Sequence, residues 1–180
     1  MKHSIPGVRT FAFTQIIGLK NIRFGTNVIV DDFTLIYARG PIRIGNYVHI
    51  ACFASITGGA PIEIGDFVAV SQGARLLSGS DDFEGWGFGN STLADKYRNV
   101  KREPIQIGRF CIVGANSVVL PGVTIGEGAM VGANSVVSRD LDAWGVYVAN
   151  GRKIRERDRN AVMKNFQGFC ADTGYTGELE

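Results

Sequence analysis

The sequence predicts an all-β fold, a parallel β-helix of triangular coils with one large loop insertion and a short C-terminal cap and tail. Three observations predict it. Aliphatic residues recur at every sixth position, the recurrence appears in two separate blocks, and 24 of the 180 residues are glycine against only 5 prolines. A period of six matches neither a helix, with about 3.6 residues per turn, nor the alternation of a single amphipathic strand. Aliphatic residues accompany the glycines, which excludes collagen and low-complexity disorder.

The six-residue unit is clearest in the C-terminal half. Its leading aliphatic positions run in unbroken register: Ile107, Val113, Val119, Ile125, Val131 and Val137. Four residues beyond most of them stands a second small or β-branched residue: Cys111, Ser117, Val123, Ala129 and Ser135. We expect each unit to form one side of a triangle, with its aliphatic side chain on the axis. The small residue and the glycine are expected at the corner, where a bulky Cβ or a restricted φ would clash.

The N-terminal half repeats the pattern in triplets that restart every 20 residues. These triplets are Phe24, Val30 and Ile36, then Ile44, Ile50 and Ile56, then Ile64, Val70 and Leu76. Three units and a two-residue insertion account for this spacing, so three units should complete one turn. Stacked turns pair each side in parallel and bury ladders of aliphatic side chains, each contributing about 1.5–3 kcal/mol when fully buried.

The predicted layout is a single domain, residues 1–180. The repeats cover about residues 22–77 and 105–138, the loop insertion covers 78–104, and the cap and tail cover 139–180. A cap is expected because the end of a stack of strands would otherwise expose unpaired backbone groups. Residues 158–166 are expected to add a helical turn or two, and residues 168–180 to form a poorly ordered tail.

Composition narrows the classes of partner. A formal net charge of +2 gives no general surface for nucleic acid or anionic membranes, and no apolar run is long enough to insert into a bilayer. The three cysteines, Cys52, Cys111 and Cys170, lie far apart without C-x-x-C spacing. This argues against a disulfide framework and against a zinc site, and it favours a reducing cytoplasm. We expect a cytoplasmic protein with a small-molecule partner and no metal.

Three segments carry a family resemblance: residues 104–108 (PIQIG), 113–126 (VGANSVVLPGVTIG) and 131–137 (VGANSVV). They resemble the hexapeptide-repeat acyltransferases, most closely the sugar acetyltransferases of bacterial surface polysaccharide biosynthesis, over about residues 20–157. The resemblance implies a left-handed β-helix and a homotrimer with active sites between neighbouring subunits. It also implies acetyl-CoA as the donor and a sugar or nucleotide-linked sugar as the acceptor.

The loop insertion is where function is expected, because insertions in solenoids lie outside the core. The resembling enzymes carry a general-base His at the start of this loop, whereas this chain has Asp81 and Asp82. An Asp with an ordinary pKa near 3.9 is a poor base for a hydroxyl but can bind an ammonium group. We therefore favour transfer to an amino group. Two adjacent carboxylates could raise one pKa and allow transfer to a hydroxyl instead, and the pair could also simply cap a turn.

Aromatic residues accompany the two carboxylates. Phe83, Trp86 and Phe88 are candidates for stacking on the acceptor, with packing against a neighbouring subunit as the alternative. His49 occupies an outward position of its unit, where a solvated surface His is the ordinary interpretation.

The resemblance also implies where the coenzyme lies. A thin pantetheine arm fits a groove lined by small side chains, and the outward residues after Gly114 and Gly132 are the candidates: Ala115, Asn116, Ala133 and Asn134. The basic residues matched to the coenzyme's phosphates are Arg139, Arg152 and Lys153, with a solvated tail as the alternative. The closing G-x-P-A-K motif of the resembling enzymes lacks its proline here.

Two functions from other classes of protein compete with sugar acetylation. A carbonic-anhydrase-like enzyme needs about three His ligands per metal, and the chain has only His3 and His49. A non-catalytic binding or structural β-helix remains the alternative, because the fold alone does not guarantee activity. The acidic, aromatic loop favours the enzyme.

Overall fold

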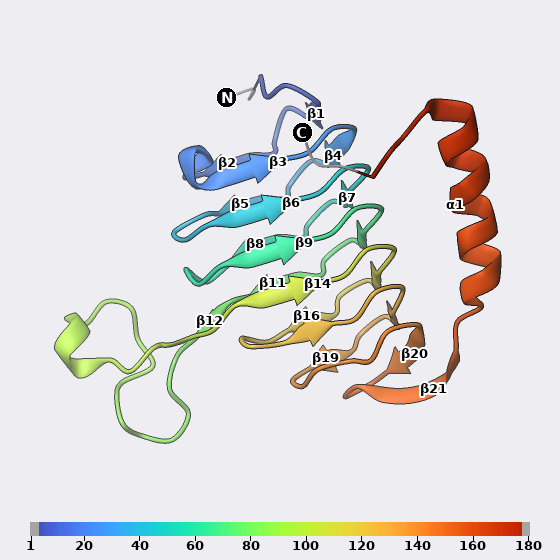
Figure 1. Ribbon diagram of the computed structural model, residues 1–180. Coiled ribbons are helices and arrows are strands. Elements are labelled where there is room, and N and C mark those ends of the chain that lie inside the picture. The colour runs from blue at the N-terminus through green and yellow to red at the C-terminus, as the bar shows by residue number, and fades with distance from the viewer. Residues whose placement is uncertain (1–3, 178–180) are drawn as a thin grey trace.

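The computed structural model, which describes residues 4–177, is a left-handed parallel β-helix with three sheets as its sides (Figure 1). In spatial order, sheet A contains β1 (Val8–Thr10), β4 (Val28–Val30), β7 (His49–Ile50), β10 (Ala69–Val70), β15 (Ile112–Val113), β18 (Met130–Val131), β20 (Gly145–Val148) and β21 (Arg152–Glu156). Sheet B contains β19 (Val136–Val137), β16 (Val118–Val119), β11 (Arg75–Leu77), β8 (Ser55–Thr57), β5 (Leu35–Tyr37) and β2 (Gln15–Ile17). Sheet C contains β17 (Thr124–Ile125), β14 (Ile105–Ile107), β9 (Ile62–Ile64), β6 (Ile42–Ile44) and β3 (Ile22–Phe24).

Strand register confirms the predicted repeat. In sheet C, Ile22 pairs with Ile42 and Ile42 with Ile62, which is the 20-residue spacing of the N-terminal half. Ile62 then pairs with Ile105 across the loop insertion, and the shorter spacing of the C-terminal half follows. The coil also starts before residue 22, because β1 and β2 pair in parallel with β4 and β5.

The aliphatic ladders fill the interior. Every predicted axial residue is buried except Phe24, which is half-buried at the N-terminal end. The predicted small corner residues are buried as well: Cys111, Ser117, Val123, Ala129 and Ser135. The expectation of an aliphatic axis is therefore confirmed.

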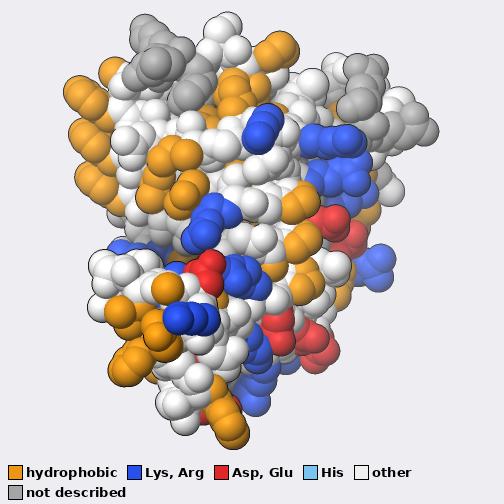
Figure 2. Space-filling model, turned by 90° about the vertical axis from the view of Figure 1, so that its left-hand side faces the viewer, with side chains coloured by type: hydrophobic (Ala, Val, Ile, Leu, Met, Phe, Trp, Pro, Cys, Tyr) orange, Lys and Arg blue, Asp and Glu red, His pale blue; other side chains and the backbone are white. Residues whose placement is uncertain are grey.

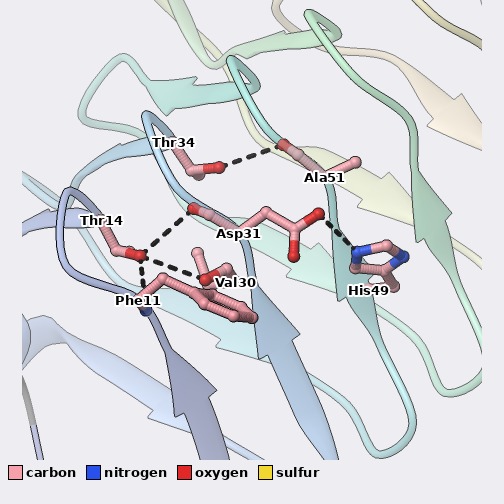
Figure 3. Close-up of polar contacts among 7 residues, drawn as sticks. All are labelled: Phe11, Thr14, Val30, Asp31, Thr34, His49 and Ala51. Carbon is pink, nitrogen blue, oxygen red and sulfur yellow. Dashed lines mark hydrogen bonds and ion pairs between the residues drawn. The ribbon is translucent and has the colours of Figure 1, made fainter.

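Corner hydroxyl groups satisfy backbone groups that would otherwise lack partners. Thr14 Oγ1 donates to the carbonyl oxygens of Val30 and Asp31, both at 3.2 Å, and accepts from the amide of Phe11 at 3.0 Å (Figure 3). On the next turn, Thr34 Oγ1 donates to Ala51 O at 3.0 Å (Figure 3).

The glycines act differently from the sequence expectation. The left-handed corner positions are held largely by aromatic residues and Asn, including Phe33, Phe53, Phe67 and Phe110 with φ between 58° and 61°. Glycine of the repeat is needed for close approach between turns: a Cβ on Gly114 would lie 2.5 Å from Val131 O. The Cβ clash was predicted correctly, whereas the prediction of glycine at a special φ holds for Gly73, Gly122 and Gly128 and not for Gly114.

The C-terminal region departs most from expectation. After β20 and β21, which pair antiparallel, helix α1 (Arg159–Thr173) runs along one corner of the stack (Figure 1). Asp158 caps its N-terminus and Gly174, with φ of 71°, ends it. The expectation of a poorly ordered tail from residue 168 was wrong over the described residues, because Phe166, Phe169 and Tyr175 pack on a ladder of rings that sequence spacing does not reveal.

Candidate active site

The loop insertion is anchored by a short antiparallel stem. Strands β12 (Gly79–Ser80) and β13 (Lys101–Arg102) pair through Gly79 with Arg102 and Ser80 with Lys101. Between them the chain projects from one corner of the stack and contains the 3-10 helix η2 (Asp95–Tyr97); a second such helix, η1 (Leu19–Asn21), lies near the N-terminus (Figure 1). The stem lets the chain return to sheet C at Ile105 without breaking the axial ladder.

An acidic hollow of about 740 Å³ lies where the loop meets the stack. Its loop side includes Asp81, Asp82 and Phe83, and its stack side includes Leu120 and Ser138. Leu120 and Ser138 directly follow β16 and β19. The hollow therefore joins the inserted loop to the last strands of sheet B.

The two carboxylates have different partners. Asp81 pairs with Arg98 at 3.2 Å, and Arg98 also lies 3.7 Å from Asp95. Asp82 accepts a hydrogen bond from the Glu84 amide at 2.7 Å. That bond lowers the pKa of Asp82 below its usual value, helped by the amides of Trp86 and Gly87, although partial desolvation opposes the shift. Asp82 is therefore an ionised group at neutral pH.

The predicted coenzyme residues come together at one corner, the coenzyme corner (Ala115, Asn116, Ala133 and Asn134). The Asn134 amide donates to Ala115 O at 2.8 Å, which stacks one turn on the other. Asn116 and Asn134 hold the left-handed conformation, with φ of 57° and 56°. From this corner, β16 and β19 run to the acidic hollow, and four extended residues span about 13 Å.

The basic candidates lie beyond this corner. Arg139 follows Ser138 and donates from Nη2 to Gly151 O at 3.4 Å. Arg152 and Lys153 lie on β21, where both are exposed. Lys153 pairs with Glu156 at 2.6 Å, and this bond raises the pKa of the lysine. Arg139 and Arg152 thus lie on either side of Gly151, whereas Lys153 is already paired.

Both the sequence and the fold are similar to those of known proteins. Residues 104–139 match the family model described as bacterial transferase hexapeptide (six repeats). The chain is 37% identical over 147 residues to the Escherichia coli dTDP-4-amino-4,6-dideoxy-D-glucose acyltransferase, covering 81% of this chain and 77% of that protein. This chain belongs to the hexapeptide-repeat sugar acyltransferases.

Solved structures agree with this assignment. AntD, an N-acyltransferase from Bacillus cereus in complex with dTDP and 3-hydroxybutyryl-CoA, superposes on this acyltransferase with a TM-score of 0.86 and 34% identity, covering 92% of this chain and 88% of AntD. A hexapeptide-repeat containing acetyltransferase from Vibrio cholerae shares the fold, with a TM-score of 0.53 and 21% identity over 83% of this chain and 70% of that one. Together with the sequence match, these structures identify the chain as an acyl-transferring enzyme.

The aromatic candidates of this acyltransferase separate in space. Phe83 borders the acidic hollow, although 93% of it is exposed. Trp86 and Phe88 do not border it and lie further out on the loop, 79% and 65% exposed. Figure 2 looks onto this side of the molecule and shows hydrophobic side chains on the surface of the projecting loop. Both interpretations, stacking on an acceptor and packing on a neighbouring subunit, require this exposure.

His49 lies away from the loop. It projects from sheet A with half of its side chain exposed, and its Nε2 lies 2.9 Å from Asp31 Oδ2 (Figure 3). It is not among the residues that line the acidic hollow. The other histidine, His3, lies outside the described residues.

Several residues of the site were missed by sequence reasoning. Arg98, Asn99 and Lys101 lie in the polar stretch of the loop, and the antiparallel stem brings them back to Ser80 and Asp81. Ser138 immediately precedes Arg139, one of the basic residues predicted to contact the coenzyme's phosphates. The pairing of Ser80 with Lys101 lies outside the six-residue repeat, so the repeat does not reveal it. Only a prediction that the two ends of the loop pair with each other could have identified these residues.

Within residues 4–177 there is no group of three or more His, Cys, Asp or Glu side chains that could hold a metal ion. The same part of the chain contains no helix long and apolar enough to cross a membrane. Cys52, Cys111 and Cys170 are free thiols, and burial raises the pKa of Cys111 to about 12, which keeps it unreactive.

Proposed function

We propose that this acyltransferase moves an acetyl group from acetyl-CoA to the amino group of a nucleotide-linked amino sugar for surface polysaccharide. The observation that carries the proposal is the acidic hollow, which places Asp81 and Asp82 beside the ends of the two strands that lead from the coenzyme corner. The Escherichia coli relative, named for a dTDP-linked amino sugar, supports the acceptor class.

The state of Asp82 favours an amine over a hydroxyl. A carboxylate with a lowered pKa remains ionised and attracts an ammonium group, but it is a weak base for a hydroxyl. Once the ammonium group has lost one proton, by way of the carboxylate to solvent, the neutral amine nitrogen attacks the thioester carbonyl and gives up a second proton as the amide forms. The N–C bond forms, the C–S bond breaks, and the departing thiolate takes a proton to become the free thiol of coenzyme A.

The coenzyme corner suits the pantetheine arm. Small side chains at Ala115 and Ala133 leave the backbone accessible, and Asn116 and Asn134 stand beside them. We assign Arg139, Arg152 and Lys153 to the phosphates, with Lys153 requiring release from Glu156.

The character of the three faces supports a homotrimer. Sheet C presents charged or polar residues outward, whereas the outward row of sheet A is mostly apolar, with Ile29, Ala69, Ile112, Met130 and Val146 beside Arg9 and His49. Sheet B adds exposed Ile17 and Val136, and the corner between A and B stacks Phe13, Phe33 and Phe53 with ring centroids 5.2 Å apart. A cyclic trimer brings two different faces of each chain together, and this chain has two adjacent apolar ones. The free thiols suit a reducing cytoplasm.

The test replaces the carboxylates. In the Asp81→Asn/Asp82→Asn double variant we expect kcat/KM for acetyl transfer to a dTDP-linked amino sugar to fall at least about a hundredfold, because ammonium binding and proton removal are lost together. Thiol release from acetyl-CoA measures the rate, and the hydroxyl counterpart of the sugar serves as the second acceptor. We expect activity on the amine alone.

Asp95→Asn provides the matched control, because that carboxylate lies on the same loop, is fully exposed and also faces Arg98. It should retain near-normal turnover. An unchanged rate in the double variant, with its oligomeric mass preserved, would remove both aspartates from the mechanism. Faster transfer to the hydroxyl counterpart would overturn the assignment of the amine.

A further inference from the structure

A second hollow adjoins the acidic one. It measures about 200 Å³ and shares Ser80 and Asp81 with its neighbour. We call it the basic hollow (Tyr37, Arg39, Arg98 and Arg102). Three guanidinium groups against one carboxylate give it the opposite charge to the acidic hollow, and Figure 2 shows basic and acidic side chains gathered where the stack meets the loop.

Two of the three guanidinium groups are available to a ligand. Arg39 and Arg102 are exposed, and neither has a carboxylate at ion-pair distance in the described part of the chain. They flank the same spot, because a Cβ added to Gly59 would lie 3.6 Å from Arg39 Cβ and 3.6 Å from Arg102 Cδ. The lining of the hollow also includes Gly58 and Gly79, which carry no side chains, so an anion can approach both arginines.

The third arginine is held in place. Arg98 is only 12% exposed, and its ion pairs with Asp81 and Asp95 fix the guanidinium. Its Nε is shielded from solvent and has no hydrogen-bond partner among residues 4–177. Arg98 therefore contributes positive charge to the basic hollow, while its guanidinium stays held by the two carboxylates.

An aromatic ring completes the hollow. Tyr37, at the end of β5, is 41% exposed and lies with the Arg39 guanidinium 5.9 Å from its ring centroid. Guanidinium forks bind phosphate oxygens in pairs, and exposed aromatic faces stack on bases. Both parts of a nucleoside diphosphate therefore find a matching group here.

We infer that the basic hollow binds the diphosphate of the nucleotide sugar through Arg39 and Arg102, with Tyr37 against the base. The inference rests on the proposed function. Because the two hollows share Ser80 and Asp81, one substrate can lie across both, with its diphosphate on the arginines and its amine at Asp82. The opposite charges of the two hollows then set the orientation in which the acceptor binds.

The test removes two charges. In Arg39→Ala/Arg102→Ala we expect the Kd for dTDP, measured by titration calorimetry, to rise at least about tenfold because two phosphate contacts are lost. The KM for the nucleotide sugar should rise similarly, while kcat and the KM for acetyl-CoA change little. Arg23→Ala/Arg43→Ala, which removes the same charge from sheet C, should bind dTDP like the parent enzyme.

The outcomes separate this inference from the proposed function. Unchanged dTDP affinity in the Arg39/Arg102 variant overturns the inference and leaves acetyl transfer intact. Equal weakening in the sheet C control overturns it too, because net charge would then be the cause. Weaker dTDP binding in the Arg39/Arg102 variant but not in the sheet C control supports the inference, even if no thiol is released from acetyl-CoA. Arg102→Lys, which keeps the charge and loses the fork, should fall between the parent enzyme and Arg102→Ala.

Discussion

At the scale of single residues, the approach between turns decides which side chains are tolerated. A Cβ on Gly114 would lie 2.5 Å from Val131 O and 2.6 Å from Ala133 N, so the backbone itself would have to move. At the left-handed corners, by contrast, a large side chain is kept although its backbone conformation is strained. Phe67 has φ of 58°, a strain of about 1–2 kcal/mol, which stacking with Tyr47 and Phe110 at about 0.5–1.5 kcal/mol per pair offsets.

Gly114→Ala should therefore lower the free energy of unfolding by about 1–3 kcal/mol, because the new methyl group overpacks the backbone. Gly168→Ala is the matched control: it lies in α1, has no atom within 4 Å of its missing Cβ, and should raise stability by about 0.5–1 kcal/mol. Urea unfolding at one protein concentration measures both. Equal stability of Gly114→Ala and the parent would contradict the close-approach argument.

At the scale of elements, α1 is held by half-buried side chains such as Phe166 and Phe169, and none of its residues is fully buried. Phe166 and Phe169 contact Phe67 edge-on at 5.5 and 5.3 Å. Beyond the helix, Tyr175 donates its hydroxyl to Asp66 at 2.6 Å and accepts from Asn46 at 3.3 Å. This polar contact fixes the end of the chain against the corner.

Tyr175 should also make stability depend on pH. Burial, together with the bond to Asp66, raises the pKa of Tyr175 from 10.0 to about 12. Because the folded pKa is raised, the hydroxyl's contribution is present in full below pH 10 and is lost between pH 10 and 12. Tyr175→Phe should cost about 0.5–1.5 kcal/mol at pH 8 and less at pH 11. Urea midpoints at both pH values measure this, and a constant difference would sink the assignment.

At the scale of the whole molecule, the coil presents three unlike faces. The charged face of sheet C suits solvent, with Arg23, Arg43 and Glu63 outward, whereas sheets A and B meet at the stacked Phe13, Phe33 and Phe53. These rings are 54–63% exposed in the single chain. Such a patch favours association, and two adjacent patches allow a ring to close.

Phe33→Asp should therefore weaken the proposed trimer, because it places a charge within the apolar corner while Asp tolerates the left-handed φ. Light scattering after gel filtration should show the parent at three times the 19.4 kDa of one chain and the variant shifted toward one chain. Arg43→Asp on sheet C should keep the parent's mass. A parent that elutes as a single chain would rule out the homotrimer.

Sequence reasoning singled out part of the candidate site. Asp81 and Asp82 stand out because they follow the last regular unit, and the coenzyme corner because its six-residue pattern repeats from Ala115 to Ala133. Arg39 and Arg98 did not stand out. They lie far apart in sequence, and only the antiparallel stem at the base of the loop brings Arg98 back to the rim where Arg39 lies.

The sequence by itself determined the coil, its register and the position of the one interruption, because a period of six fixes which residue faces the axis, turn after turn. Only the tertiary structure decided how the segments outside that period lie: the folded loop, the two hollows of opposite charge, and helix α1 against Tyr47, Phe67 and Phe110. Their contacts join residues distant in the chain by ring stacking and ion pairs, which leave no regular spacing in the sequence.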